Sequence, residues 1–279
     1  MRPGERVRQY TASDGARIAY SDDGEGRPLV LLHGLMADSG FFGRQRDLSN
    51  NYRTIAIDLR GHGRTPAGRE APTIGRLAED VADLAQALEL EGAVGIGWSL
   101  GAAVLWRVLA GPASQRFAGA VVIDMTPRVL NDDGWDLGLS RETCEARSHA
   151  ICNDFQAFAA AAGQAIFATP GPEADRAAAA FAANDPAAIG ALWKSLVEAD
   201  FRPLLPSIRQ PTLVVHGAQS HLYGADTAGH LVAALPNARA VAFDRSGHAP
   251  HLEQPELFNA AIREFAATLP PVRQTEATA

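Results

Sequence analysis

The sequence predicts an α/β fold built on a mostly parallel sheet, and three observations predict it. Short apolar segments typical of buried strands alternate with helical patterns over residues 29–124 and again from residue 211. Such alternation is typical of βαβ units, whose strands run parallel. Between these stretches, residues 127–206 contain Ala-rich helical patterns and no convincing strand. At residues 97–101, a Gly-Trp-Ser-Leu-Gly turn joins a predicted strand directly to a predicted helix.

The predicted strands are short apolar runs bounded by turn residues, and they lie at residues 7–20 (a hairpin), 29–32, 54–58, 92–96, 120–123, 211–216 and 240–243. Two helices are predicted in the same region, at residues 77–88 and 102–109. The first of them carries Leu77, Val81, Leu84 and Leu88 on one face. We therefore expect residues 1–126 and 207–269 to form the core, residues 127–206 a helical cap, and residues 270–279 a flexible tail.

The turn at residues 97–101 predicts a nucleophilic serine. Ser99 lies between a strand and a helix, with Gly97 and Gly101 two residues away on either side. In a strand–turn–helix arrangement this tight, larger side chains at the glycine positions would clash, and the serine hydroxyl is lifted clear of the backbone. The helix N-terminus behind the serine favours developing negative charge. Ser99 is therefore the predicted nucleophile.

A nucleophilic serine needs a base and an oxyanion hole, and the chain offers both. His248 lies on a Gly-containing loop directly after the last predicted strand, where it can reach a central strand. The strand at residues 29–32 ends in His33-Gly34-Leu35-Met36, which is where this architecture supplies a second oxyanion amide. We expect the backbone N–H groups of Leu35 and Leu100 to form the oxyanion hole.

These motifs resemble those of the α/β-hydrolases along nearly the whole chain, at residues 33–34, 58–65, 97–101, 211–217, 247–248 and 253–255. The resemblance implies an α/β-hydrolase fold: a mostly parallel central sheet flanked by helices, with a helical cap over the site. The turn around Ser99 is similar to that of the pimeloyl-carrier-protein methyl ester esterases. In relatives the side chain next to the nucleophile faces the substrate, so we expect Trp98, together with Met36, to line the substrate pocket.

The catalytic acid departs from the family pattern. In most relatives an Asp follows the strand that corresponds to residues 211–216, but here Ser220 stands at about that position. A neutral serine does not stabilise an imidazolium as a carboxylate does. Some family members carry the acid on the strand after the nucleophile helix, where this chain has Asp124. Asp226 and Asp244 are the alternatives, but the first is predicted on a helix and the second is close in sequence to His248. Asp124 is the predicted acid.

Composition excludes several other classes of protein. Hydrophobic residues make up 47% and charged residues 20% of the 279, which is typical of a globular protein with a sizeable core. The net charge of −7 and a pI of about 5.6 argue against binding to nucleic acid or to an anionic membrane. Neither an apolar leader nor an apolar run long enough to span a bilayer is present, and Cys144 and Cys152 are too few for a disulfide framework. We therefore expect a cytoplasmic protein.

The predicted function is a metal-free and cofactor-free serine hydrolase that cleaves a small to medium, largely apolar carboxylic ester or lactone. Its oligomeric state is left open. The histidines outside the site lack the spacing of a metal-ligand motif, namely His216, His221, His230 and His251. The alternatives are a pimeloyl-carrier-protein methyl ester esterase, a cofactor-free perhydrolase or carbon–carbon bond hydrolase, and a hydrolase-like protein that binds a small ligand without turnover.

Overall fold

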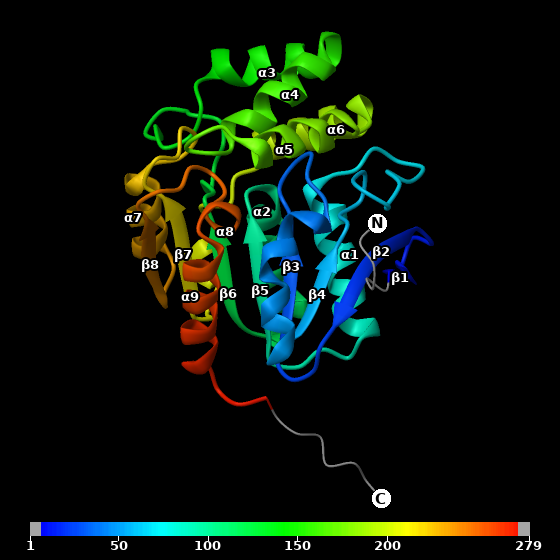
Figure 1. The fold of residues 1–279 in the computed structure, drawn as a ribbon, viewed down its shortest axis with the longest axis vertical. Coiled ribbons are helices and arrows are strands. Elements are labelled where there is room, and N and C mark those ends of the chain that lie inside the picture. The colour runs from blue at the N-terminus through cyan, green and yellow to red at the C-terminus, as the bar shows by residue number, and fades with distance from the viewer. Residues whose placement is uncertain (1–6, 273–279) are drawn as a thin grey trace, which may run out of the picture.

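An eight-stranded sheet forms the centre of the computed structural model, which describes residues 7–272 (Figure 1). The strands are β1 (Val7–Thr11), β2 (Arg17–Asp23), β3 (Pro28–Leu32), β4 (Arg53–Ile57), β5 (Ala93–Trp98), β6 (Phe117–Ile123), β7 (Thr212–Gly217) and β8 (Ala238–Phe243). Their order across the sheet is β1-β2-β4-β3-β5-β6-β7-β8. Only the pairs β1–β2 and β2–β4 are antiparallel, so the predicted mostly parallel sheet is confirmed.

The central strands are apolar because helices cover both of their faces. Every residue of β3 and β5 is buried, as is typical of parallel strands between two helical layers. In Figure 1, α8 (Pro250–Glu253), α9 (Pro255–Ala267) and the 3₁₀ helix η1 (Ser39–Asn50) lie in front of the sheet. Helices α1 (Ile74–Ala87) and α2 (Leu100–Leu109) lie behind it. Two short 3₁₀ helices, η2 (Pro112–Arg116) and η3 (Leu205–Ser207), and α7 (Ala225–Ala234) complete the core.

Helix α1 shows how local sequence produces these elements. Thr73 caps it, because its side chain accepts a hydrogen bond from the N–H of Arg76. Leu77, Val81 and Leu84 are all buried, so the face predicted from their spacing is the one that packs on the core.

Helix η1 was not predicted, and its geometry explains why. The residues that it buries are Ser39, Phe42, Gln45 and Leu48, which repeat every three positions. A period of three is typical of a 3₁₀ helix, whereas the apolar period that predicts an α-helix from sequence is 3.6.

Four helices lie between β6 and β7 in the chain: α3 (Arg141–Asn153), α4 (Phe155–Ala165), α5 (Pro172–Ala182) and α6 (Pro186–Glu198). They form a layer beyond the carboxyl ends of the central strands (Figure 1). Small buried residues line the contact between α4 and α5, including Ala159, Ala174 and Ala177. This layer corresponds to the segment expected to form the cap.

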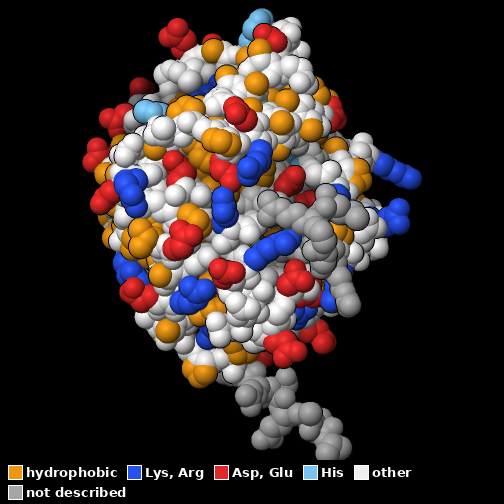
Figure 2. Space-filling view, viewed as in Figure 1, with side chains coloured by type: hydrophobic (Ala, Val, Ile, Leu, Met, Phe, Trp, Pro, Cys, Tyr) orange, Lys and Arg blue, Asp and Glu red, His pale blue; other side chains and the backbone are white. Residues whose placement is uncertain are grey.

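The predicted tail lies mostly outside the described residues, since only 270–272 of residues 270–279 are described. Within residues 7–272, none of the helices is long and apolar enough to cross a membrane. On the face shown in Figure 2, the described acidic and basic side chains are interspersed.

Candidate active site

Ser99 lies in a strained turn at the carboxyl end of β5. The strand ends one residue before it and α2 begins one residue after it. Its backbone has φ of 52° and ψ of −117°, a conformation that non-glycine residues rarely adopt. A Cβ atom on Gly97 would lie 2.5 Å from the carbonyl oxygen of Gly101, and one on Gly101 would lie 2.1 Å from that of Leu32. Only glycine fits these two positions, as the sequence predicts.

Asp124 lies at the end of the neighbouring strand, β6. The strands β5 and β6 pair up to Trp98 and Ile123, and the N–H of Ser99 donates to the carbonyl of Ile123 at 3.0 Å. Asp124 itself is 2% exposed and has a positive φ of 43°. Sheet pairing therefore brings Ser99 and Asp124 to adjacent strand ends, although 25 positions separate them in the sequence.

His248 meets Asp124 from the other side. Its Nδ1 lies 2.6 Å from Asp124 Oδ2, and both side chains are buried. The backbone on either side of the ring is held as well. The N–H of Gly247 donates to Glu253 Oε1 at 2.7 Å, and the indole Nε1 of Trp98 donates to the carbonyl of His248 at 2.8 Å. The imidazole is thus fixed through its ring and through its main chain.

Glu253 connects this loop to the helical layer. Its other oxygen, Oε2, accepts a hydrogen bond of 2.8 Å from the N–H of Ala168, which lies between α4 and α5. Burial raises the pKa of Glu253, although its backbone donors act in the opposite direction. One carboxyl group therefore ties the His248 loop to the segment above it.

Ser99 Oγ forms no hydrogen bond with any described residue, and this includes His248. The structure thus joins His248 to Asp124 but does not join His248 to Ser99. In ligand-free enzymes the bond between nucleophile and base is often long and tightens only when substrate binds.

The alternative acids do not approach His248 through any hydrogen bond of the described residues. Asp226 is exposed in the first turn of α7, and Asp244 is exposed after β8, where its carbonyl accepts from the side chain of Gln219.

Ser220 is the residue whose contact was not anticipated. In the sequence, Ser220 stands where most relatives carry the catalytic Asp. In the structure, its hydroxyl donates to Asp124 Oδ2 at 2.7 Å. The signal in the sequence was the position itself, three residues after the end of β7.

The loop at residues 33–36 lies against Ser99. A Cβ atom on Gly34 would be 3.3 Å from the Cβ of Ser99, so the two backbones are in close contact. The N–H groups of Leu35 and Leu100 find no acceptor among the described residues. Two unsatisfied amides beside a serine are what an oxyanion hole requires.

Two buried histidines hold this loop reciprocally. His33 Nε2 accepts from the N–H of Leu59 at 3.0 Å, and His62 Nε2 accepts from the N–H of Met36 at 3.1 Å. Each ring also contacts a carbonyl of its own loop through Nδ1. Burial lowers the pKa of His33 and lowers that of His62 to about 3, so both rings are neutral and can accept. These contacts give both histidines a structural role.

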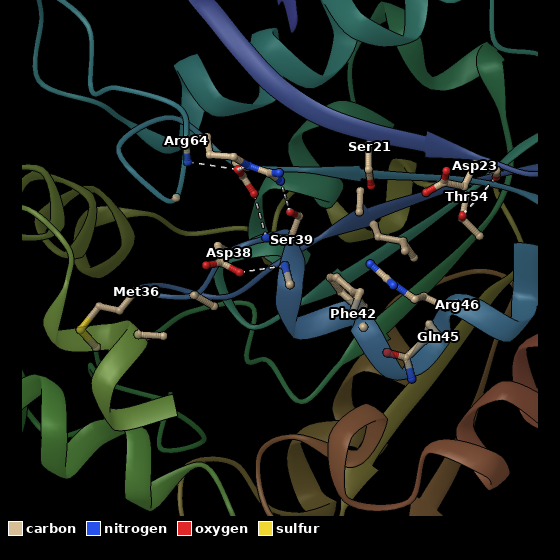
Figure 3. Close-up of a pocket in the computed structure, with 18 of the residues that line it drawn as sticks. Ser21, Asp23, Met36, Asp38, Ser39, Phe42, Gln45, Arg46, Thr54 and Arg64 are labelled. Atoms are coloured by element: carbon tan, nitrogen blue, oxygen red, sulfur yellow. Dashed lines mark hydrogen bonds and ion pairs between the residues drawn. The ribbon is translucent and has the colours of Figure 1, made fainter. Parts of the chain in front are cut away.

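Met36 is held from the other side by the helical layer. Asn184, which follows α5, donates to the carbonyl of Met36 at 2.7 Å. The side chain of Met36 lines one end of a pocket of about 520 Å³, opposite the end lined by Asp23 and Thr54 (Figure 3). Neither Ser99 nor His248 is part of this lining.

An ion pair between the exposed Arg64 and the buried Asp58 lines that pocket. Asp58 Oδ2 accepts from both the N–H and the Nε of Arg64, and Asp58 Oδ1 accepts from the N–H of Ser39. Figure 3 shows Arg64, Ser39 and Asp38 meeting at this end of η1. Asp58 thereby anchors the loop after β4.

Trp98 is buried, with 1% of its surface exposed. Its ring contacts those of Phe41, His248 and His251 at centroid distances of 5.8, 5.6 and 4.8 Å. It does not line the pocket in Figure 3, so its place on a substrate pocket stays a prediction.

Within residues 7–272, no group of three or more His, Cys, Asp or Glu side chains is arranged to hold a metal ion.

Comparison with known proteins shows the family of the chain. The model of the alpha/beta hydrolase family matches residues 29–261. A pimeloyl-[acyl-carrier protein] methyl ester esterase of Nitrosomonas europaea is 31% identical over 260 residues, covering 87% of this chain and 97% of that protein. A non-heme chloroperoxidase of Streptomyces lividans is 31% identical over 282 residues, covering 91% and 98%.

The chain therefore belongs to the α/β-hydrolase family, and the resemblance seen in its motifs is confirmed. Its class is that of the hydrolytic enzymes. Among solved structures, an esterase from Exiguobacterium antarcticum superposes with a TM-score of 0.90 over 94% of this chain and all of that one. Because the two are 24% identical, this likeness shows the fold alone.

Proposed function

We propose that the protein is a serine hydrolase that cleaves a carboxylic ester or lactone through an acyl-enzyme on Ser99. In the first step, Ser99 Oγ attacks the carbonyl carbon while its proton passes to His248 Nε2. The tetrahedral intermediate then expels the alcohol, which takes that proton from His248. Water then attacks the acyl carbonyl and gives a proton to His248. The second tetrahedral intermediate expels Ser99 Oγ, which takes that proton back from His248, and the carboxylic acid is released.

The N–H groups of Leu35 and Leu100 are proposed to bind the oxyanion of each tetrahedral intermediate. Such donors act on charge that develops only in the transition state, and each is worth about 3 kcal/mol of barrier. This assignment is supported by the contact between the loop at residues 33–36 and Ser99, and by the two amides that lack an acceptor among the described residues.

The observation that carries the proposal is the 2.6 Å hydrogen bond between His248 Nδ1 and Asp124 Oδ2. When Nδ1 keeps its proton for this bond, Nε2 is the unprotonated nitrogen available as base. The carboxylate then stabilises the imidazolium that forms in each step. A protein that only binds a ligand would have no need of this hydrogen-bonded pair beside the strained turn at Ser99.

Labelling with a fluorophosphonate, combined with hydrolysis of a short ester, tests the proposal. Wild-type protein is expected to label at Ser99, and Ser99→Ala is expected to lose both labelling and turnover while it stays folded. Ser140→Ala is the matched control, because Ser140 caps α3 and the hydrogen bonds of its hydroxyl within residues 7–272 are to Thr143 alone. Labelling at Ser220, or turnover by Ser99→Ala, would contradict the assignment and favour a different nucleophile. An unlabelled, inactive wild type would favour the ligand-binding alternative.

We also propose that the substrate is small to medium in size and largely apolar. Leu35 and Phe41 are half-buried apolar side chains beside the nucleophile, and the ring of Phe41 stacks on Trp98 and contacts Phe181 of the helical layer. Burial of substrate CH₂ groups in such surroundings is favourable by about 0.8 kcal/mol each. A series of esters of increasing acyl length should therefore give a rising kcat/KM until the pocket is full. A flat series, or a preference for charged acyl groups, would contradict this.

The second candidate is the methyl ester of a pimeloyl group on a carrier protein, and the relative of Nitrosomonas europaea favours it. An acidic carrier protein would need a basic docking surface on the helical layer. Several cations there are already paired with acids, among them Arg128 with Asp132, Arg176 with Glu173, Lys194 with Glu198, and Arg202 with Asp200. Because these cations are already paired, we place the carrier-bound methyl ester second.

Competition between a short neutral ester and the carrier-bound methyl ester separates the two candidates. A much higher kcat/KM for the carrier-bound substrate, lost when Arg141 and Arg147 of α3 are changed to Ala, would reverse our preference. An equal or lower value would leave the small ester as the substrate class.

A further inference from the structure

We infer that Ser220 is a positioning residue, which holds the Asp124 carboxylate in the orientation that His248 requires. The inference rests on the proposed function, because it assigns Ser220 a part in the same reaction. Its basis is that Ser220 and His248 donate to the same oxygen of Asp124.

Two hydrogen bonds hold the carboxylate of Asp124. Within the described residues, Ser220 Oγ at 2.7 Å and His248 Nδ1 at 2.6 Å are the two groups bonded to its carboxylate, both at Oδ2. Asp124 Oδ1 is buried and accepts no hydrogen bond from a described residue. Without Ser220, the imidazole of His248 would be the one hydrogen-bond partner left among the described residues to orient this carboxylate.

The contacts of the Ser220 hydroxyl fix the direction of its proton. Ser220 Oγ accepts from the N–H of Leu222 at 3.3 Å and from the N–H of Tyr223 at 3.5 Å. A hydroxyl has one proton to donate, and these two backbone donors occupy its acceptor side. The proton of Ser220 is therefore directed at Asp124, where it makes a charge-assisted hydrogen bond to the ionised carboxylate.

Hydrogen bonds join the loop that carries Ser220 to the loop that carries His248. The N–H of Ala218 donates to Phe243 at 3.0 Å, and the N–H of Gln219 donates to Ser246 at 2.9 Å. The side chain of Gln219 donates to the carbonyl of Asp244 at 2.8 Å. The two donors to Asp124 thus keep a fixed spacing, which suits a residue that sets the direction of a carboxylate.

These contacts also explain why a neutral residue stands at position 220. Its hydroxyl lies within hydrogen-bond distance of Asp124, where a second carboxylate would repel the first or force one of them to take up a proton. Once the acid is on β6, this position is best filled by a donor. A serine supplies the donor without the charge.

Steady-state kinetics of Ser220→Ala in the full chain tests the inference. Loss of one hydrogen bond to a charged group should lower kcat about 10- to 100-fold, with KM changed less than about twofold. Ser220→Thr keeps the hydroxyl and should recover most of kcat. Ser140→Ala, which removes another hydroxyl that accepts a backbone N–H, should leave kcat unchanged.

A double variant separates positioning from a purely structural role in the turn. If Ser220 acts through the carboxylate, Ser220→Ala should cause no further loss of kcat in an Asp124→Asn background. A role in folding the turn would instead give an independent loss in both backgrounds, with a lower unfolding midpoint. Should Ser220→Ala fail to fold, Ser220→Cys, whose thiol is a weak donor, is expected to show the same loss of kcat.

A kcat for Ser220→Ala within twofold of wild type, or additive losses in the double variant, would overturn the inference. Failure of the proposed function looks different, because then Ser99→Ala would keep its activity or the wild-type protein would not hydrolyse esters at all.

Discussion

Asp124 is the residue on which the interpretation of the site depends most. It follows β6, has a positive φ of 43°, and is nearly inaccessible to solvent. Asp tolerates the left-handed region better than most residues, so a carboxylate can be accommodated there at modest cost. The conformation directs its oxygen to His248 at 2.6 Å, while the position used by most relatives carries Ser220.

Asp124→Asn preserves the shape of the side chain but removes its charge. The variant can no longer stabilise the imidazolium of His248 or favour the tautomer with the proton on Nδ1. We expect kcat for ester hydrolysis to fall by about 10⁴-fold, as in other catalytic triads. Asp226→Asn and Asp244→Asn serve as controls, since both side chains are exposed and should tolerate the change. If Asp226→Asn or Asp244→Asn is the variant that loses activity, Asp124 is not the catalytic acid.

At this scale the sequence identifies Ser99 because its signal is local: a strand, two glycines and a helix within a few positions. Ser220 has no such signal. Its contact joins residues 96 positions apart and depends on how the ends of β6 and β7 meet. No periodicity or short motif encodes that distance.

Among the elements, the loops at residues 33–36 and 59–62 behave as one unit. His33 receives an N–H from the second loop, and His62 receives an N–H from the first. Glycines mark both loops in the sequence, and apolar runs mark the strands before them. The sequence does not show that the two loops contact each other, because this contact depends on two buried rings that desolvation keeps neutral. The prediction from sequence also missed η1, whose buried face repeats every three residues.

Replacing His62 by Leu tests this unit. The N–H of Met36 would lose its acceptor in a buried position, which costs about 1–3 kcal/mol of the free energy of unfolding. Urea denaturation measures the change. His62→Gln is the matched variant, because its side-chain oxygen can accept the N–H, and it should recover part of the stability. A Leu variant as stable as wild type, or more stable than the Gln variant, would show that the bond contributes little.

For the molecule as a whole, buried neutral histidines make stability depend on pH. Burial lowers the pKa of His62 and of His251 to about 3, against an ordinary value near 6.5 in the unfolded chain. Their contribution to stability is complete above pH 6.5. As the pH falls below that value the unfolded state binds protons that the folded state does not, so stability declines until about pH 3.

Denaturant midpoints measured between pH 7.5 and pH 4 should therefore decrease with falling pH. His251→Phe provides the comparison, because His251 contacts the rings of Phe42, Trp98 and Phe258 and an apolar ring suits that position. This variant removes one of the titrating groups and should show a shallower decline. The same decline in both proteins would mean that His251 takes no part in the pH dependence.

The register between β5 and β6 has a consequence for heat tolerance. Ser99 and Asp124 stand on adjacent strands of the central sheet, so their spacing is set by the interstrand distance of about 4.8 Å rather than by a loop. His248 stands on a loop between β8 and α8. Loops open at a lower free energy than central strands, so warming displaces His248 before it separates Ser99 from Asp124. Selection for a higher working temperature should accordingly act on residues 244–254, where the bond from Trp98 to His248 and the bond from Gly247 to Glu253 hold the imidazole in place, and leave β5 and β6 unaltered.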